Sequence, residues 1–80
     1  MNYVIRKRTT DGNFKTLKEL PNTSEAIAKS VAAVLSCQKG HYDDFIYLVD
    51  DENQRSIVYS KGMRWCEFKD NKIIYHRYSK

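Results

Sequence analysis

Side chains that could act as nucleophiles or metal ligands are few and widely spaced in this sequence. The two cysteines, Cys37 and Cys66, lack the C-x-x-C spacing of a zinc or redox site. The two histidines, His41 and His76, have no second histidine or cysteine at zinc spacing. No phosphate-binding glycine loop and no hydrolase or metalloprotease motif occurs. The sequence therefore predicts no catalytic residue, no metal site and no cofactor. It favours two small, buried, unpaired thiols over a disulfide.

Five carboxylates gather between residues 43 and 52, and clustered carboxylates can bind Ca²⁺ or Mg²⁺. They are Asp43, Asp44, Asp50, Asp51 and Glu52. The Asp-Asp-Glu-Asn run at 50–53 lacks the alternating ligands and the central glycine of a calcium-binding loop. We therefore expect these residues to mark strand ends and a turn.

The last third of the chain interleaves cations with aromatic rings, and this combination could bind rather than catalyse. Residues 55–80 hold seven Lys and Arg and two acidic residues. Planar Arg groups suit phosphate or carboxylate, and rings offer stacking surface for unpaired bases. The predicted contact residues, with two helpers from the amino terminus, are Arg6, Arg8, Arg55, Lys61, Arg64, Trp65, Lys69, Lys72, His76, Arg77 and Tyr78. The alternative places Trp65, Tyr59 and Tyr75 in the core and leaves the cations as an ordinary protective edge.

Composition and charge limit the class of protein. The chain has 80 residues, so we expect one domain over 1–80, and 41% hydrophobic with 30% charged residues is typical of a folded domain. Residues 1–8 hold three cations and no acid, whereas residues 9–54 hold four cations and eight acids. If the two basic segments are neighbours, the molecule has a positive and a negative face. Alternatively, the 14 Lys and Arg only confer solubility.

The amino terminus shows no targeting segment. Residues 1–5 enter a strand-like run directly, without the apolar region of a secretory leader. No apolar run approaches the ~18 residues of a membrane span. We expect a soluble, cytoplasmic protein of the host cell.

In the first half of the chain the patterns predict a hairpin and a helix. Residues 3–8 read as a strand, Asp11-Gly12 as a turn, and residues 14–20 as a second strand or an irregular arm. After Pro21, residues 24–38 show helical spacing. The expected cap is Asn22 or Thr23, with Gly40 as the stop. The expected buried stripe comprises Ala26, Ile27, Ser30, Val31, Val34 and Leu35.

Four further strands are predicted at 44–50, 55–60, 63–69 and 72–78. Short turns at 51–54, 61–62 and 70–71 require the strands to run antiparallel. In the third of these strands, alternation places Met63, Trp65 and Glu67 on one face. It places Arg64, Cys66 and Phe68 on the other. We therefore expect an α+β fold in two layers, with one helix packed on an antiparallel sheet of four to six strands that ends in a meander. The face without the helix is open to water or a partner.

Several segments resemble small phage-encoded anti-CRISPR proteins that act on type I-F surveillance complexes. The likeness covers residues 3–67. It comprises an opening strand (Tyr3-Val-Ile-Arg-Lys), a helix start (Thr23-Ser-Glu-Ala-Ile-Ala-Lys), an acidic turn between two strands at 51–53, and Tyr59-Ser-Lys-Gly-Met-Arg-Trp65. The chain departs from this family in its longer 9–20 arm and its additional strand at 72–78. The resemblance implies a non-enzymatic inhibitor that binds a CRISPR ribonucleoprotein and blocks target DNA, without assigning any single residue.

The sequence thus predicts a binding protein that inhibits a nucleic-acid-handling complex. One alternative is a domain that binds DNA or RNA directly through a basic aromatic sheet face. Another is a dimerising accessory domain whose exposed strand pairs edge to edge. Both a monomer and a homodimer are compatible with these readings.

Overall fold

The computed structural model describes residues 1–70 and 72–75 and contains one helix on a six-stranded antiparallel sheet. The strands are β1 (Tyr3–Arg8), β2 (Phe14–Leu20), β3 (Phe45–Asp50), β4 (Arg55–Ser60), β5 (Met63–Lys69) and β6 (Lys72–Tyr75). The helix α1 (Glu25–Cys37) follows β2, and a short 3₁₀ turn (Asp51–Asn53) joins β3 to β4. The predicted α+β fold, including its carboxyl-terminal meander, is confirmed. Residues 76–78 of the last predicted strand lie outside the described residues.

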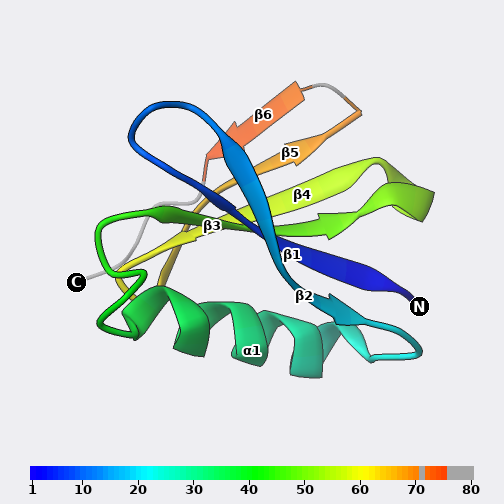
Figure 1. The fold of residues 1–80 in the computed structure, drawn as a ribbon. Coiled ribbons are helices and arrows are strands. Elements are labelled where there is room, and N and C mark those ends of the chain that lie inside the picture. The colour runs from blue at the N-terminus through cyan, green and yellow to red at the C-terminus, as the bar shows by residue number, and fades with distance from the viewer. Residues whose placement is uncertain (71, 76–80) are drawn as a thin grey trace.

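The sheet order is β2-β1-β3-β4-β5-β6, so β1 inserts between its hairpin partner and the strand after the helix. Helix α1 packs beneath β3, β4 and β5 (Figure 1). The sheet curls away from α1, so that the β1–β2 turn and β6 both rise above the central strands (Figure 1). One face is therefore covered by the helix, and we call the opposite one the open face.

The covered face carries the core. Along β1, β3 and β4, alternate side chains point toward α1 because successive residues of a strand face opposite sides. The buried cluster consists of Tyr3, Ile5, Leu20, Ala28, Ala32, Ile46, Leu48, Ile57 and Tyr59. The central position expected for the apolar strand β3 is confirmed.

The helix is where predicted, but its buried stripe is different. The side chains against the sheet are Ala28, Ala32 and Ser36, whereas Ile27 and Val34 are each 59% exposed. Small residues four apart let the helix backbone lie close to the sheet, and Val31 and Leu35 pack beside them, partly buried. The expected stripe is therefore right for Val31 and Leu35 but wrong for its other members, Ala26, Ile27, Ser30 and Val34, which are exposed.

Both helix ends also differ from expectation. Ser24 is the amino-terminal cap, and its Oγ accepts a hydrogen bond from the Ile27 amide at 3.3 Å. Asn22 instead adopts φ +50°, a turn conformation that precedes the cap. At the other end Gln38 closes the helix through its amide and the Leu35 carbonyl, so Gly40 is not the stop.

The carboxyl-terminal turn of α1 is hydrogen-bonded to the β4–β5 turn. Buried Ser36 accepts a hydrogen bond from the Gly62 amide at 2.8 Å and donates one to the Ala33 carbonyl at 2.7 Å. Gly62 has φ +81°, and a Cβ there would overlap the Cys37 sulfur. Glycine therefore serves both the tight turn and the close approach of the helix.

The expectation for the cysteines is half right. Both thiols are free, and Cys66 is buried, but Cys37, the last residue of α1, is exposed. Burial raises the pKa of the Cys66 thiol.

Candidate functional site

The open face is built by the strand residues that alternate with the core. In β1, Tyr3 and Ile5 point to the helix, so Arg6 and Arg8 project from the open side. In β3, Ile46 and Leu48 are buried beneath the sheet, and the residues between them project upward. The side chains that line the two main hollows of this face include Arg6, Arg8, Phe14, Phe45, Tyr47, Val49, Ser56, Val58, Trp65, Cys66, Phe68 and Ile73.

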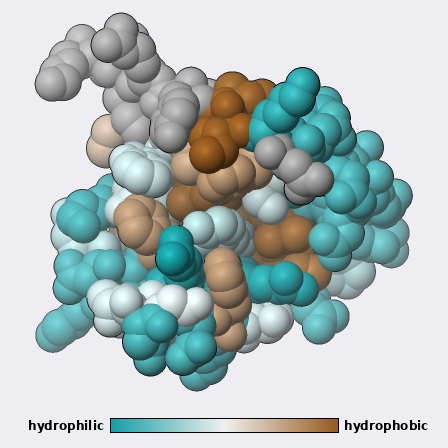
Figure 2. Space-filling model, turned by 90° about the horizontal axis from the view of Figure 1, so that it is seen from above, coloured by the Kyte–Doolittle hydropathy of each residue, from teal (hydrophilic) through white to brown (hydrophobic). Residues whose placement is uncertain are grey.

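Aromatic residues are concentrated on the open face. All three phenylalanines and the single tryptophan of the chain lie there, together with Tyr47. Phe14 and Trp65 are 57% and 51% exposed. Figure 2, which views this face, shows hydrophobic side chains gathered near its middle with hydrophilic ones around them. Exposed apolar patches of this kind are typical of interaction sites, so this face is the candidate site.

Four of these five aromatic side chains form two pairs. Phe14 meets Tyr47 edge to face, with ring centroids 5.2 Å apart and an interplanar angle of 78°. Phe45 meets Trp65 at the same centroid distance and a 38° angle. Both geometries are favourable for aromatic contacts.

A β-bulge in β5 places Trp65 on the open face. In the β4–β5 pairing, Val58 lies opposite Cys66 and Tyr59 opposite Arg64, so Trp65 is the additional residue. Trp65 and Cys66 consequently line the same hollow. The expected alternation through β5 is therefore wrong: Glu67 lies on the helix side, away from Trp65.

Two neighbouring hollows on the open face contain its aromatic side chains. The larger, about 510 Å³, is lined by Arg6, Phe14, Tyr47, Val49, Asp51, Gln54, Arg55, Ser56 and Phe68. The smaller, about 270 Å³, is lined by Arg8, Phe45, Tyr47, Val58, Trp65, Cys66, Phe68 and Ile73. Because Tyr47 and Phe68 line both, the hollows are neighbours on one continuous surface.

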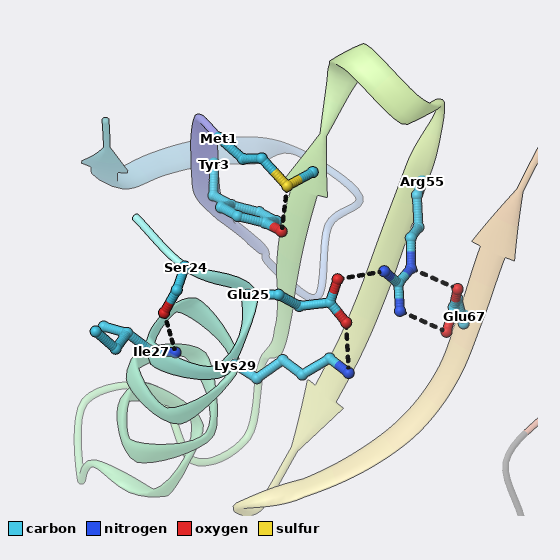
Figure 3. Close-up of polar contacts among 8 residues, drawn as sticks. All are labelled: Met1, Tyr3, Ser24, Glu25, Ile27, Lys29, Arg55 and Glu67. Atoms are coloured by element: carbon cyan, nitrogen blue, oxygen red, sulfur yellow. Dashed lines mark hydrogen bonds and ion pairs between the residues drawn. The ribbon is translucent and has the colours of Figure 1, made fainter. Parts of the chain in front are cut away.

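The arginines differ sharply in their surroundings. Within residues 1–70 and 72–75, neither Arg6 nor Arg8 takes part in an ion pair, and both are exposed. Arg55 instead contacts Glu67 through Nε at 2.6 Å and Glu25 through Nη1 at 2.9 Å (Figure 3). These contacts tie α1 to β4 and β5, so the Arg55 guanidinium serves the fold.

Lys29 extends the same cluster, with its Nζ 2.8 Å from the Glu25 carboxylate (Figure 3). Hydrogen bonds from Lys29 and Arg55 lower the pKa of Glu25, and the hydrogen bond to Glu67 raises the pKa of Arg55. Nearby, burial and then the charge of Glu25 raise the pKa of the Tyr3 hydroxyl, which donates to the Met1 sulfur. On the covered side, Glu25 therefore links Lys29 of the helix and Arg55 of β4 in one charged cluster.

The structure brings together only part of the predicted contact set. Arg6, Arg8 and Trp65 share the open face. Arg55 also lines the larger hollow, but its guanidinium is paired with Glu25 and Glu67. Arg64 pairs in register with buried Tyr59 and lies on the helix side. The remaining described lysines lie at the strand ends, where Lys61 sits over the Tyr42 ring, 5.0 Å from its centroid, and Lys69 pairs with Lys72 beside the β5–β6 turn.

Three of the predicted contact residues, His76, Arg77 and Tyr78, lie outside the described residues, as does the side chain of Tyr75. Of the rings weighed as core, Tyr59 is buried, whereas Trp65 is not.

Sequence reasoning missed Phe14, Phe45, Tyr47 and Phe68 as members of this surface. A signal for two of them exists in β3, where aromatic residues occupy positions 45 and 47 and aliphatic ones positions 46 and 48. That alternation separates an aromatic face from an aliphatic face, although every residue of the run is apolar.

The acidic residues of 43–52 do not form a metal site in the described structure. Asp44 pairs with Lys7 at 3.3 Å, and Asp50 is buried, accepting a hydrogen bond from Asn53 at 2.7 Å. Among residues 1–70 and 72–75, no group of three or more His, Cys, Asp and Glu side chains is placed to hold a metal ion. No helix in that part of the chain is long and apolar enough to cross a membrane.

Edge pairing is opposed at β2, the described edge strand next to β1. The β1–β2 pairing shifts register between Ile5 and Arg6, and Lys15 and Lys18 are exposed on β2. Bulges and lysines are features that protect a sheet edge from pairing with another chain.

Comparisons with protein-family models, with curated proteins and with solved structures found no match.

Proposed function

We propose that this protein is a non-enzymatic binding protein whose ligand docks on the open face of the sheet. One observation carries the proposal: this face holds five aromatic side chains together with Arg6 and Arg8, which form no ion pair among the described residues. A stable fold gains little from exposing Phe14 and Trp65 to water, because burying such rings would be favourable. Their exposure is accounted for by a partner that covers them.

The target that we propose is a nucleic-acid-handling complex of the host cytoplasm, specifically a CRISPR ribonucleoprotein that the protein inhibits. The resemblance to type I-F anti-CRISPR proteins favours this target. So does the electrostatic character of the chain, whose net charge is +4. The protein would then act by occupying a surface that target nucleic acid needs.

A capture experiment tests this proposal. Tagged protein is mixed with a lysate from CRISPR-bearing bacteria, and the bound material is compared before and after nuclease treatment. We expect one ribonucleoprotein to be retained through nuclease treatment and its cleavage of target DNA to be inhibited. Recovery of the tagged protein alone from lysates of each CRISPR type, with cleavage unaffected, would refute the proposed target.

Paired variants locate the contact surface. Trp65→Ala and Phe14→Ala should abolish capture, since each removes an exposed ring from the open face. Ile27→Ala and Val34→Ala are matched controls, because these side chains are equally exposed but lie on the helix. If the helix variants lose capture and the ring variants keep it, the protein binds through α1 and not through the open face, and the proposal is wrong.

A further inference from the structure

The two hollows of the open face repeat one arrangement of side chains. The larger contains the Phe14–Tyr47 ring pair and Arg6, and the smaller contains the Phe45–Trp65 pair and Arg8. Each hollow therefore offers an aromatic surface beside a cation. Arg6 and Arg8 are two residues apart on one strand, so about 6.6 Å separates their backbones.

We propose that the open face binds an unpaired nucleic-acid strand, with one base in each hollow and neighbouring phosphates at Arg6 and Arg8. The inference rests on the proposed function, because both place the ligand on this face, and it names the part of the target that the face holds. Proteins that bind single strands combine rings on which bases stack with cations that follow the backbone. Both components are present here in duplicate.

The charges on the face favour this occupant over an apolar protein segment. Arg6 and Arg8 lack ion-pair partners in the described structure, so a bound anion need not displace a carboxylate from them. Asp51 also lines the larger hollow, so a phosphate bound there must lie beside Arg6 and away from this carboxylate. Guanidinium groups are planar donors that suit phosphate oxygens. An apolar segment would leave both cations without a counter-charge at the border of the contact.

The two hollows differ in how they would treat the base. Gln54 and Ser56 line the larger hollow and can hydrogen-bond to base edges. The smaller hollow is lined mainly by apolar and aromatic side chains, including Val58 and Ile73, and offers chiefly stacking. Base preference should therefore reside in the larger hollow. Stacking and phosphate contacts do not involve the sugar hydroxyl, so DNA and RNA strands should bind alike.

Trp65 provides a direct readout because it is the only tryptophan and lies in the smaller hollow. We would titrate the full chain with short oligothymidylate and oligouridylate and follow tryptophan fluorescence, with a DNA duplex and a polyglutamate peptide as comparison probes. Both single strands should quench the fluorescence with similar affinity. For two phosphate contacts, the logarithm of the association constant should fall with that of the salt concentration with a slope of about −1.4.

Single substitutions distinguish the contribution of base stacking to strand binding from that of the phosphate contacts. Phe14→Ala should weaken strand binding roughly tenfold or more, because a stacked base is lost. Arg6→Ala should make the salt slope less steep by about 0.7, one phosphate contact. Lys15→Ala removes the same charge from an exposed position of the adjacent strand, and Val34→Ala shortens an equally exposed helix side chain. Both controls should retain wild-type affinity and slope.

The outcomes distinguish this inference from the proposed function. Capture of a ribonucleoprotein through the open face without fluorescence change on any single strand would overturn the strand inference and leave the proposed function standing. Quenching by polyglutamate alone would also overturn it, in favour of an acidic protein ligand. Quenching by single strands without ribonucleoprotein capture would support the inference and remove the proposed target. Equal binding of duplex and single strand would refute base stacking.

Discussion

The two faces of the sheet differ in the apolar side chains that they carry and in whether their arginines are paired. Beneath the sheet, aliphatic side chains are sealed by α1, and Arg55 is held between Glu25 and Glu67. Above it, aromatic side chains remain partly exposed, and Arg6 and Arg8 have no ion-pair partner in the described structure. A cation or a ring therefore indicates a binding function only when its tertiary surroundings leave it unsatisfied.

Adjacent residues of β3 give the largest expected contrast between the faces. Ile46 is fully buried toward α1, and Ile46→Ala should lower the free energy of unfolding by about 2–5 kcal/mol through lost burial and a cavity. Phe45→Ala should cost only about 1 kcal/mol, because Phe45 is half-buried and its main ring contact is Trp65. Urea denaturation measures both values.

Ligand binding should show the reverse order. The Phe45→Ala variant should lose ligand binding, whereas the Ile46→Ala variant, as long as it is folded, should retain it. Comparable losses of stability in the two variants would mean that the open face is as much a core as the covered one.

The two faces can also be compared by replacing an arginine with alanine on each of them. Arg55→Ala removes the contacts to Glu25 and Glu67 and should destabilise the fold by about 1.5–3 kcal/mol, the range for hydrogen bonds to charged groups. Arg6→Ala should change stability by less than about 0.5 kcal/mol, since it removes an exposed side chain without an ion pair. Thermal unfolding compares them, with Lys15→Ala as a second exposed control. A larger loss for Arg6→Ala would invert the assignment of the two faces.

The smallest effect is a dependence of stability on pH. The pKa of Glu25 is lowered in the folded protein by hydrogen bonds from Lys29 and Arg55. Its contribution is therefore present above its unfolded pKa, near pH 4, and is lost as the pH falls through the lower folded value. Because the Glu25 side chain is 39% exposed, the contribution is modest.

Glu25→Gln should be less stable than the wild type at pH 7, and the difference should shrink below about pH 4. Denaturation at a series of pH values measures it, with Glu19→Gln, an exposed β2 position, as the control. A difference that grows on acidification would contradict the sign of the shift.

Local signals in the sequence were sufficient for most elements of the fold. Asp11-Gly12 and Lys61-Gly62 are turns because glycine adopts the positive φ that these connections require. The helical spacing after Pro21 and the short connections after β3 similarly fixed one helix and an antiparallel meander. These features depend on neighbours within a few residues, which the sequence displays directly.

The candidate site was harder to predict from the sequence, because it depends on contacts between distant segments of the chain. Arg6 and Arg8 join Trp65 only because β1 inserts beside β3, a pairing that no local pattern specifies. The bulge that turns Trp65 to the open face arises from the β4–β5 register, and strict alternation predicts the opposite grouping. Arg55 is indistinguishable from Arg6 in the sequence until the carboxylates around it are located.

The sequence by itself therefore determined where the strands, turns and helix lie and that one sheet face would be free. Only the tertiary structure decided which residues occupy that face. Alternation assigns side chains to two sides of a strand, but the packing of α1 decides which side is buried. Small residues on the helix allow its close contact with the covered face, so the rings and the two arginines of the opposite face remain exposed or partly exposed in the part of the chain that the structure describes.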